Sequence, residues 1–376
     1  MMIGRIVWIN ILVMVITVAL CILVIEFSVQ FYFGEKFESR PVFYQHDAEL
    51  GWVPAPNLDH RYYGSDFDIS IRTDSDGHRL GALGELDSKS NLVVLAGDSY
   101  MFGWGVNTDE TLASNLDELM AKRYGVRAVN LGVGCYGVMQ SALRMERLTT
   151  QIDTTRIKAV IVLHAHNDMT DNVKFLMFQN GMRAPEDLKR GNPSYFHSIN
   201  LLRNLVNNVF SKKTDRGRDQ SLYVKDVLFN VPLKRIEIPT RQIRVTESFS
   251  IESDSLTYEE TKPQLAFERG AFTPLQRVLM RDSIDRVNCA YPGRDLPIIH
   301  TLIHSAPAWY VDTIWQVVDA SDSCGNRIVF AGQVPVAGQF TGEIRNRHSG
   351  AHFAPALNRY YAEVFAAWLS EYLRSK

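Results

Sequence analysis

The sequence predicts an α/β protein whose main domain is a parallel β-sheet covered by helices on both faces. Two observations lead to this prediction, and a third concerns the amino terminus. Short apolar runs alternate with amphipathic stretches of helical periodicity, and this alternation is typical of parallel sheets. Glycine and polar residues follow directly after several of the apolar runs, where the functional site of such a fold is expected. One long apolar run opens the chain.

The composition is that of an ordinary globular protein. Of 376 residues, 46% are hydrophobic and 22% are charged, which excludes collagen-like and wholly disordered chains. Lysine and arginine number 40 against 42 acidic residues, so the formal net charge is −2. A charge this close to neutral provides no electrostatic footprint for nucleic acid, and we predict no nucleic-acid partner.

The amino terminus is expected to be a membrane anchor. The run Ile6–Ile25 contains 20 residues without a charge, and about 20 residues cross the hydrocarbon core of a bilayer. No small-residue cleavage pattern follows, so an uncleaved anchor over residues 1–34 is favoured over a signal peptide or a buried core helix. Arg5 precedes the run, which predicts a cytoplasmic amino end, a single crossing and the bulk of the chain outside.

Residues 35–88 are predicted to form a small β-rich extension, because polar and apolar residues alternate there around Asp-Gly turns. Residues 89–376 are predicted to form the main domain, in which five strands alternate with helices. The strands are expected at 92–96, 127–131, 158–163, 297–303 and 327–331, and the helices at 109–124, 138–148, 309–320 and 355–373.

The alternation stops between about 175 and 265, which predicts an insertion. Residues 203–244 carry 10 basic and 4 acidic residues, whereas residues 247–260 carry 5 acidic and no basic residues. A solvated loop with internal charge pairing is favoured, and contact with an anionic polymer or lipid is the alternative.

Four cysteines are too few for a fold built on disulfides. Cys289 and Cys324 flank one predicted strand-to-helix unit. Two separate buried thiols are slightly favoured there, and a disulfide in an oxidising compartment is the alternative.

Four short motifs provide candidates for chemistry. Ser99, within Gly97-Asp98-Ser99, directly follows the first strand, where a serine is exposed as a nucleophile. After the second strand, the turn Gly134-Cys135 can aim backbone N–H groups at an oxyanion. After the third strand, Asn167 can add a side-chain amide, and His352, just before the last helix, can act as general base for Ser99.

These motifs, in this order, resemble those of the SGNH hydrolases, also called the GDSL esterase and lipase family. The likeness covers roughly residues 90–172 and 297–374, and the motifs Leu50–Val53 and Asp76–Arg79 resemble the extension of membrane-anchored bacterial members. The resemblance implies a flavodoxin-like three-layer α/β/α sandwich with a five-stranded parallel sheet. It also implies Ser99 as nucleophile, His352 as base, and the oxyanion donors Ser99 N–H, Gly134-Cys135 N–H and Asn167.

The sequence departs from the family pattern at two positions. Family members usually have an aspartate three residues before the histidine, whereas this chain has Ser349, and no carboxylate lies between Glu343 and His352. The acid is therefore missing, supplied from elsewhere or replaced by a carbonyl. Cys135 stands where the family often has glycine, and its N–H donates equally well unless the position needs a positive φ.

Structural roles compete with functional ones at several of these positions. Asp98 is expected to cap the turn before a helix. For Asn167-Asp168 and His352, a structural role at the start of a loop or a helix is the less favoured alternative. His164, His166 and His304 also fall at strand ends, and we expect them, with Asp98, Asp168 and Ser349, to line the pocket. A third ligand at diagnostic zinc spacing is missing, so neither a metal nor another cofactor is predicted.

The sequence therefore predicts a membrane-anchored serine hydrolase that works through an acyl-enzyme. Water as acceptor makes it an esterase or deacetylase, and a sugar hydroxyl makes it an O-acyltransferase. Its location suggests an acylated surface carbohydrate or lipid as substrate. The rival hypothesis is a non-catalytic binding or assembly protein of the cell envelope that kept the fold.

Overall fold

A computed structural model of the chain describes residues 2–38, 44–63, 68–179, 243–245, 249–251, 272–336, 342 and 352–374. Helix α1 belongs to one compact unit, and the β extension and the main sheet belong to another. Most of the expected insertion, including nearly all of the charged stretch 203–260, lies outside the described residues. The division into an anchor, an extension and a main domain stays a prediction.

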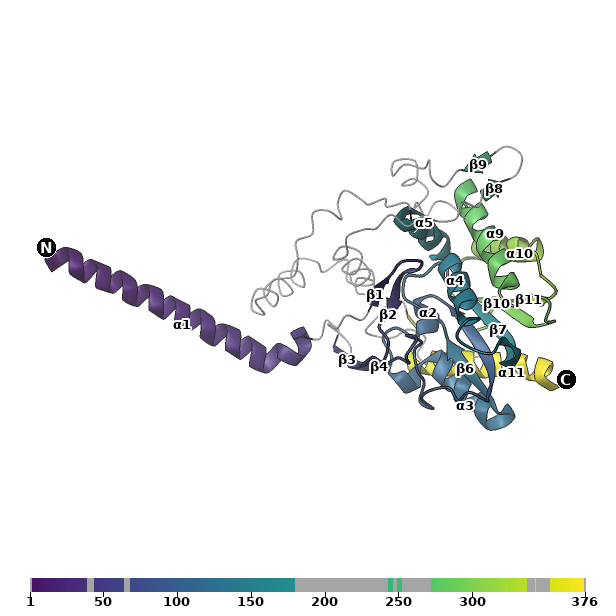
Figure 1. The fold of residues 1–376 in the computed structure, drawn as a ribbon, viewed down its shortest axis with the longest axis horizontal. Helices are drawn as coiled ribbons and strands as arrows, with labels where there is room; N and C mark the ends of the chain where they lie inside the picture. The colour runs from purple at the N-terminus through teal and green to yellow at the C-terminus, as the bar shows by residue number, and fades with distance from the viewer. Residues whose placement is uncertain are drawn as a thin grey trace. The chain divides into compact units, whose positions relative to one another are not determined.

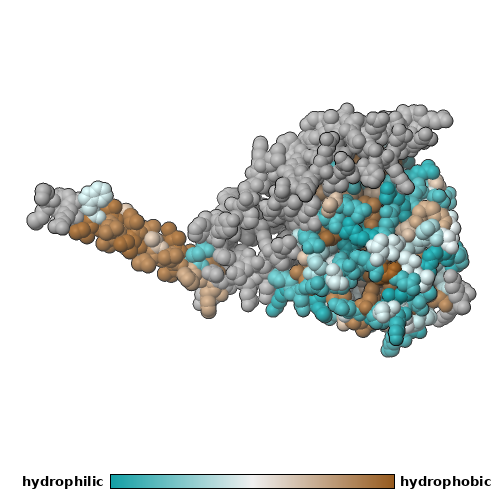
Figure 2. All heavy atoms as spheres, in the orientation of Figure 1, coloured by the Kyte–Doolittle hydropathy of each residue, from teal (hydrophilic) through white to brown (hydrophobic). Residues whose placement is uncertain are grey.

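Helix α1 (Met2–Glu38) contains the apolar run that opens the chain. Its stretch Trp8–Val29 has 22 residues and a mean hydropathy of 2.9. Large apolar side chains along it are exposed, among them Trp8 and Phe27, and they form the brown rod in Figure 2. One helix is therefore long and apolar enough to cross a membrane.

The extension is built from two antiparallel strand pairs. Strand β1 (Tyr44–Asp47) pairs with β2 (Gly51–Pro54), and β3 (Asp59–Tyr63) pairs with β4 (Asp68–Arg72). Their apolar side chains share a small core with residues that follow the first and second strands of the main sheet. The members of this core are Tyr44, Leu50, Trp52, Val53, Ile69, Ile71, Phe102, Trp104, Val133 and Tyr136.

The main sheet has five parallel strands, as the alternation of apolar runs predicts. Their bounds lie within two residues of the expected ones, and their order in space is 2-1-3-4-5 when they are counted along the chain. The strands are β6 (Val126–Asn130), β5 (Asn91–Gly97), β7 (Ile157–His164), β10 (Pro297–Leu302) and β11 (Arg327–Gln333).

The strand order places helices on both faces of the sheet. The chain leaves β5 toward β6 on one side and later crosses to β7, β10 and β11 on the other. Because crossovers between parallel strands are right-handed, the first crossover helix lies on one face and the later ones on the opposite face (Figure 1). The first is α3 (Leu112–Tyr124), which packs against α11 (Pro355–Arg374). The others are α4 (Val138–Leu148), α9 (Pro274–Cys289) and α10 (Ala308–Asp319), with α5 (Asp168–Gln179) beside α9.

Short elements complete the described chain. They are α2 (Ser99–Phe102), 3-10 turns at Thr108–Glu110 and Thr154–Arg156, and a small pair of strands, β8 (Ile243–Val245) and β9 (Phe249–Ile251).

Two sequence expectations need correction. Helix α5 continues to Gln179, past the expected start of the insertion near 175, because apolar residues such as Phe175 and Leu176 bury one of its faces. Cys289 and Cys324 form a disulfide, so the favoured prediction of two separate thiols is wrong. Helix α9 ends at Cys289 beside the turn before β11, and this brings the two Cα atoms to 5.1 Å.

Candidate active site

Ser99 is the first residue of α2, in the turn that directly follows β5. The side chain of Asp98 caps this helix and accepts a hydrogen bond from the Tyr100 N–H at 2.9 Å. The turn is tight because a Cβ atom at Gly97 would lie 2.9 Å from the Leu163 carbonyl oxygen of neighbouring β7. Asp98 thus has the capping role expected of it, and Gly97 allows the close approach that aims Ser99 out of the sheet.

His352 lies against Ser99 although 253 residues separate them. The distance from His352 Nε2 to Ser99 Oγ is 2.9 Å. The His352 ring packs on Tyr100, with ring centroids 5.1 Å apart, and the neighbouring Phe353 is buried against Tyr361 at 4.5 Å. The apolar Phe353 therefore anchors the segment that delivers the imidazole. Ser349, where the family usually has its aspartate, lies outside the described residues.

The loop after β6 also touches the nucleophile helix. Asn130 donates from Nδ2 to the Met101 carbonyl at 3.0 Å and accepts from the Gly132 N–H at 2.9 Å. A Cβ atom at Gly132 would lie 2.4 Å from the backbone nitrogen of Phe102, so only glycine fits there. Asn130 is not among the predicted site residues, although its place at the end of a strand before a glycine-rich run was a signal.

Cys135 adopts a φ of +62°, in the region that favours glycine. A non-glycine residue in this conformation costs about 1–2 kcal/mol. Burial, followed by the charge of Asp171, raises the pKa of its thiol to about 12. The thiol therefore stays protonated at neutral pH, and the structure supports Cys135 as a packed residue rather than a nucleophile.

Asn167 lies at the same edge of the sheet, but its amide group is engaged. Its Nδ2 donates to Asp98 Oδ2 at 3.1 Å and to Asp171 Oδ2 at 2.7 Å. Both amide hydrogens are thus directed at carboxyl groups. An oxyanion in the site would compete with these groups for the amide.

Three carboxyl groups share this edge of the sheet. Burial raises the pKa of Asp98 well above its ordinary value, and the charge of Asp168 is the second cause. Burial likewise raises the pKa of Asp168, which accepts a hydrogen bond from the Ala165 N–H at 3.0 Å. Asp171 forms an ion pair with Lys174 at 2.5 Å.

The three strand-end histidines have different surroundings. His164 is fully buried, and its Nε2 lies 2.9 Å from Nδ1 of His300, so it belongs to the core rather than to an open pocket. His304 is half-buried, and its ring lies 3.2 Å from the Tyr361 hydroxyl. His166 is half-buried, and burial lowers its pKa.

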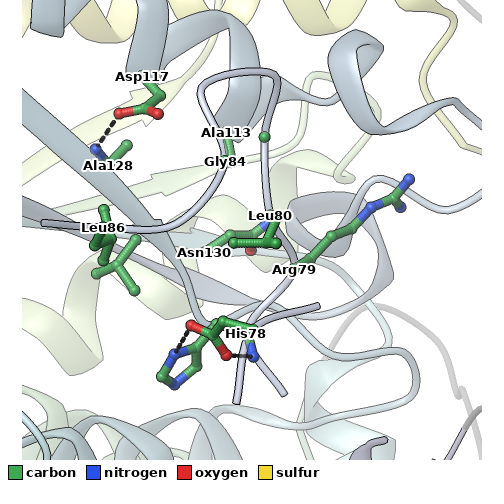
Figure 3. A pocket seen from close by; sticks show the side chains of 12 residues that line it. His78, Arg79, Leu80, Gly84, Leu86, Ala113, Asp117, Ala128 and Asn130 are labelled. Carbon is green, nitrogen blue, oxygen red and sulfur yellow. Dashed lines mark hydrogen bonds and ion pairs between the residues drawn. The ribbon is translucent and has the colours of Figure 1, made fainter. Parts of the chain in front are cut away.

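Two cavities lie away from Ser99. The one in Figure 3 has a volume of about 20 Å³ and is lined by residues of the extension, α3 and β6, including His78, Asp117 and Ala128. This volume holds about one water molecule, so it cannot hold a substrate. The second, of about 210 Å³, lies between the extension and α4 and is lined by Asp47, Arg144 and Arg147, among others.

Asp74, Asp76 and His78 lie close enough together to hold a metal ion. Asp74 Oδ1, however, already accepts from the backbone N–H groups of Asp76 and His78, and its Oδ2 lies 3.0 Å from His78 Nδ1. These bonds close a tight turn, which accounts for the cluster without an ion.

A scan of protein-family models and a search of curated proteins found no match for this chain. Among solved structures, Est1E from Butyrivibrio proteoclasticus has 9% identity and a TM-score of 0.28, with 80% of this chain and 97% of that chain covered. A thioesterase domain from the curacin biosynthetic pathway has 7% identity and a TM-score of 0.26, with coverages of 84% and 99%. Carboxyl esterase 2 from Tuber melanosporum has 10% identity and a TM-score of 0.26, with coverages of 92% and 95%.

Two of these neighbours are named as a thioesterase domain and a carboxyl esterase. With TM-scores this low, the likeness carries no argument about this chain. The parallel sheet and the residues at its edge are what bear on function.

Proposed function

We propose that this protein is a serine hydrolase that cleaves ester bonds through an acyl-enzyme on Ser99, with His352 as general base. The observation that carries the proposal is the 2.9 Å approach of His352 Nε2 to Ser99 Oγ. A nucleophile and a base in hydrogen-bond contact at the carboxyl edge of a parallel sheet are the minimum required for acyl transfer.

The reaction would proceed in two balanced halves. His352 takes the proton from Ser99 Oγ while this oxygen attacks the ester carbonyl, and the tetrahedral intermediate then collapses with transfer of the proton to the leaving alcohol. In the second half, water or a sugar hydroxyl loses its proton to His352 and attacks the acyl carbon. His352 then returns the proton to Ser99 Oγ as the second tetrahedral intermediate collapses and releases the serine. With water as acceptor the protein is an esterase, and with a sugar hydroxyl as acceptor it is an O-acyltransferase.

Three groups are proposed to bind the oxyanion. The backbone N–H groups of Ser99 and Cys135 are proposed as fixed donors, which need no reorganisation during the reaction. Asn167 takes part when one of its bonds to Asp98 and Asp171 is released. Removing a donor of this kind costs about 10²–10³ in kcat.

The strand order supports the finer assignment to an SGNH-type fold. The order 2-1-3-4-5 is the flavodoxin-like one, and ligands of such sheets bind where the strand order reverses. That point lies between β5 and β7, which lead into Ser99 and Asn167.

The proposed location is the outer face of a bacterial inner membrane, with α1 as a single-pass anchor. The disulfide between Cys289 and Cys324 supports an oxidising compartment for the main domain. An acylated surface carbohydrate or lipid is the substrate class that this location favours.

The test is turnover of a chromogenic acetate ester by the full chain in detergent. Ser99→Ala is expected to lower kcat about 10³-fold or more, whereas the control Ser75→Ala changes an exposed serine of the extension and leaves kcat unchanged. Unchanged turnover in Ser99→Ala would overturn the assignment of the nucleophile.

A non-catalytic binding protein is the second candidate, and the engaged amide of Asn167 favours it. A fluorophosphonate probe separates the two functions, because it reacts covalently only with an activated serine. Labelling that depends on both Ser99 and His352 supports the hydrolase, and no labelling of folded protein supports the binding protein.

A further inference from the structure

Two motifs of the β extension have no part in the proposed reaction so far. They are Leu50–Val53, which overlaps β2, and Asp76–Arg79, which follows β4. Each contributes one buried side chain, Trp52 or Arg79, that reaches a loop of the active site.

Trp52 contacts the loop that contains the proposed oxyanion donor. Its indole Nε1 donates to the carbonyl oxygen of Gly134 at 3.1 Å, and only 4% of the residue is exposed. The hydroxyl of Tyr136 donates in return to the Trp52 carbonyl, and the two rings meet edge to face with centroids 5.6 Å apart. The ring of Phe178 packs on Trp52 at 6.4 Å. The indole therefore holds the loop in a single position.

The bond to Gly134 also sets the direction of the next N–H. The described chain contains no cis peptide bond, and in a planar trans peptide the C=O and the N–H point in opposite directions. Gly134 C=O and Cys135 N–H belong to the same peptide unit. Because the carbonyl is held toward Trp52, the Cys135 N–H points away from Trp52. The unusual φ of Cys135, +62°, is a second sign that this peptide is held in one orientation.

Arg79 holds the turn that follows Ser99 by binding backbone carbonyls, as Trp52 holds the loop that contains Gly134. Its Nη1 donates to the carbonyls of Phe102 and Gly103 at 3.0 and 2.6 Å, and its Nη2 donates to that of Val106 at 2.7 Å. The guanidinium lies over the Phe102 ring at 4.7 Å. In Figure 3 the side chains of His78 and Arg79 leave their segment in different directions. Arg79 thereby fixes the end of the short helix that begins with Ser99.

We propose that the β extension is a positioning platform for the active site, in which Trp52 orients the Cys135 N–H toward the oxyanion. Trp52 is a positioning residue, since it acts through the Gly134 peptide and not on the substrate. This inference rests on the proposed function, because an oxyanion donor matters only if acyl transfer occurs.

The experiment compares wild type with Trp52→Phe, which removes the indole N–H but keeps an aromatic ring in the core. Trp368→Phe is the matched control, because Trp368 stacks on Phe365 in α11, away from the active-site loops. Acetate-ester kinetics are measured on each full-length protein, and kcat is expressed per Ser99 titrated to completion with a fluorophosphonate. This normalisation removes any loss of folded protein from the comparison.

Trp52→Phe is expected to lower kcat about ten- to a hundredfold and to change KM less than about threefold, because a misplaced donor weakens binding of the transition state alone. Trp368→Phe is expected to keep both constants. A kcat in Trp52→Phe equal to that of wild type, with a normal Ser99→Ala effect, overturns the role of Trp52 and leaves the proposed function intact. A wild type that neither turns over ester nor is labelled overturns the proposed function and this inference together.

Discussion

Two contacts made by histidine side chains, His352 with Ser99 and His164 with His300, have the same length but different surroundings. His352 lies 2.9 Å from Ser99 in a half-buried position, and His164 lies 2.9 Å from His300 inside the sheet, where neither ring is exposed. Both pairs join strand-end or loop segments far apart along the chain. Their difference shows that burial and partners, rather than residue type or distance, decide what a histidine can do.

The buried pair belongs to a chain of hydrogen bonds with defined protons. Asn288 uses its amide N–H on Ser321, so its oxygen accepts from His300 Nε2 at 2.8 Å. In a neutral His300 ring, Nδ1 then accepts from His164 Nε2. Burial lowers the pKa of His164 to about 3 and that of His300 well below its ordinary value, which agrees with this assignment. A pair held neutral in the core has no route to a substrate, whereas His352 faces a nucleophile.

The largest expected effect concerns the half-buried pair. His352→Ala is expected to lower kcat about 10³-fold or more while the free energy of unfolding changes little, because the ring is only partly buried. Ester turnover and urea unfolding check this, with His60→Ala as a control at another half-buried histidine. If the variant keeps more than a tenth of the wild-type kcat, His352 is not the general base.

For the buried pair of His164 and His300, a loss of stability with little loss of turnover is expected. His300→Leu leaves His164 Nε2 and the Asn288 oxygen without partners in the core, which costs about 2–3 kcal/mol of folding free energy. The kcat of the folded variant is expected within threefold of wild type, since the hydrogen bonds of His300 within the described residues go to His164 and Asn288 rather than to Ser99 or His352. Lost turnover with unchanged stability would show that the two pairs are functionally joined.

A pH titration sharpens the same comparison. Unfolded His164 takes up a proton near pH 6.5, whereas the folded residue stays neutral down to about pH 3. The unfolded state therefore binds more protons in this window, so stability is present above pH 6.5 and is lost as the pH falls. Asp98 and Asp168, whose pKa values are raised, act in the opposite direction.

The matched variant for this titration is His164→Gln, in which both carboxyl groups remain. Wild type is expected to lose roughly 1–2 kcal/mol more folding free energy than the variant between pH 6.5 and pH 5. Urea unfolding at the two pH values measures the difference. Parallel pH curves for the two proteins would mean that His164 is protonated in the folded state.

The smallest expected effect concerns the backbone strain at Cys135. Cys135→Gly relieves the φ of +62° and is expected to stabilise the protein by about 0.5–1 kcal/mol, with kcat within threefold of wild type. Cys135→Ala keeps the strain and removes only the thiol, so it separates the two contributions in thermal unfolding. Loss of turnover in both variants would assign a chemical role to the thiol.

The local features of the fold were predictable from the sequence. The helix expected at 138–148 has these bounds, and each of the five strands was placed correctly to within two residues. Helix α9 was not predicted. The disulfide was judged wrongly because spacing alone does not fix whether two Cα atoms come within reach.

The residues of the candidate site could be named from the sequence, but their contacts could not. The position of Ser99 after a strand and of His352 before the last helix was visible in the sequence. The engagement of Asn167 by two carboxyl groups was not, and neither was the reach of Arg79 to the carbonyls beside the nucleophile. These contacts depend on side-chain directions that no periodicity encodes.

The sequence by itself determined the apolar helix at the amino terminus, the alternation of strands and helices, and the order of the four motifs. Each of these follows from the hydrophobicity and spacing of neighbouring residues, which act over short distances along the chain. Only the tertiary structure decided that His352 meets Ser99, that His164 pairs with His300 inside the core, and that Trp52 holds Gly134. These contacts join residues 82 to 253 positions apart, so they exist only once the order of the strands has brought the ends of distant segments together.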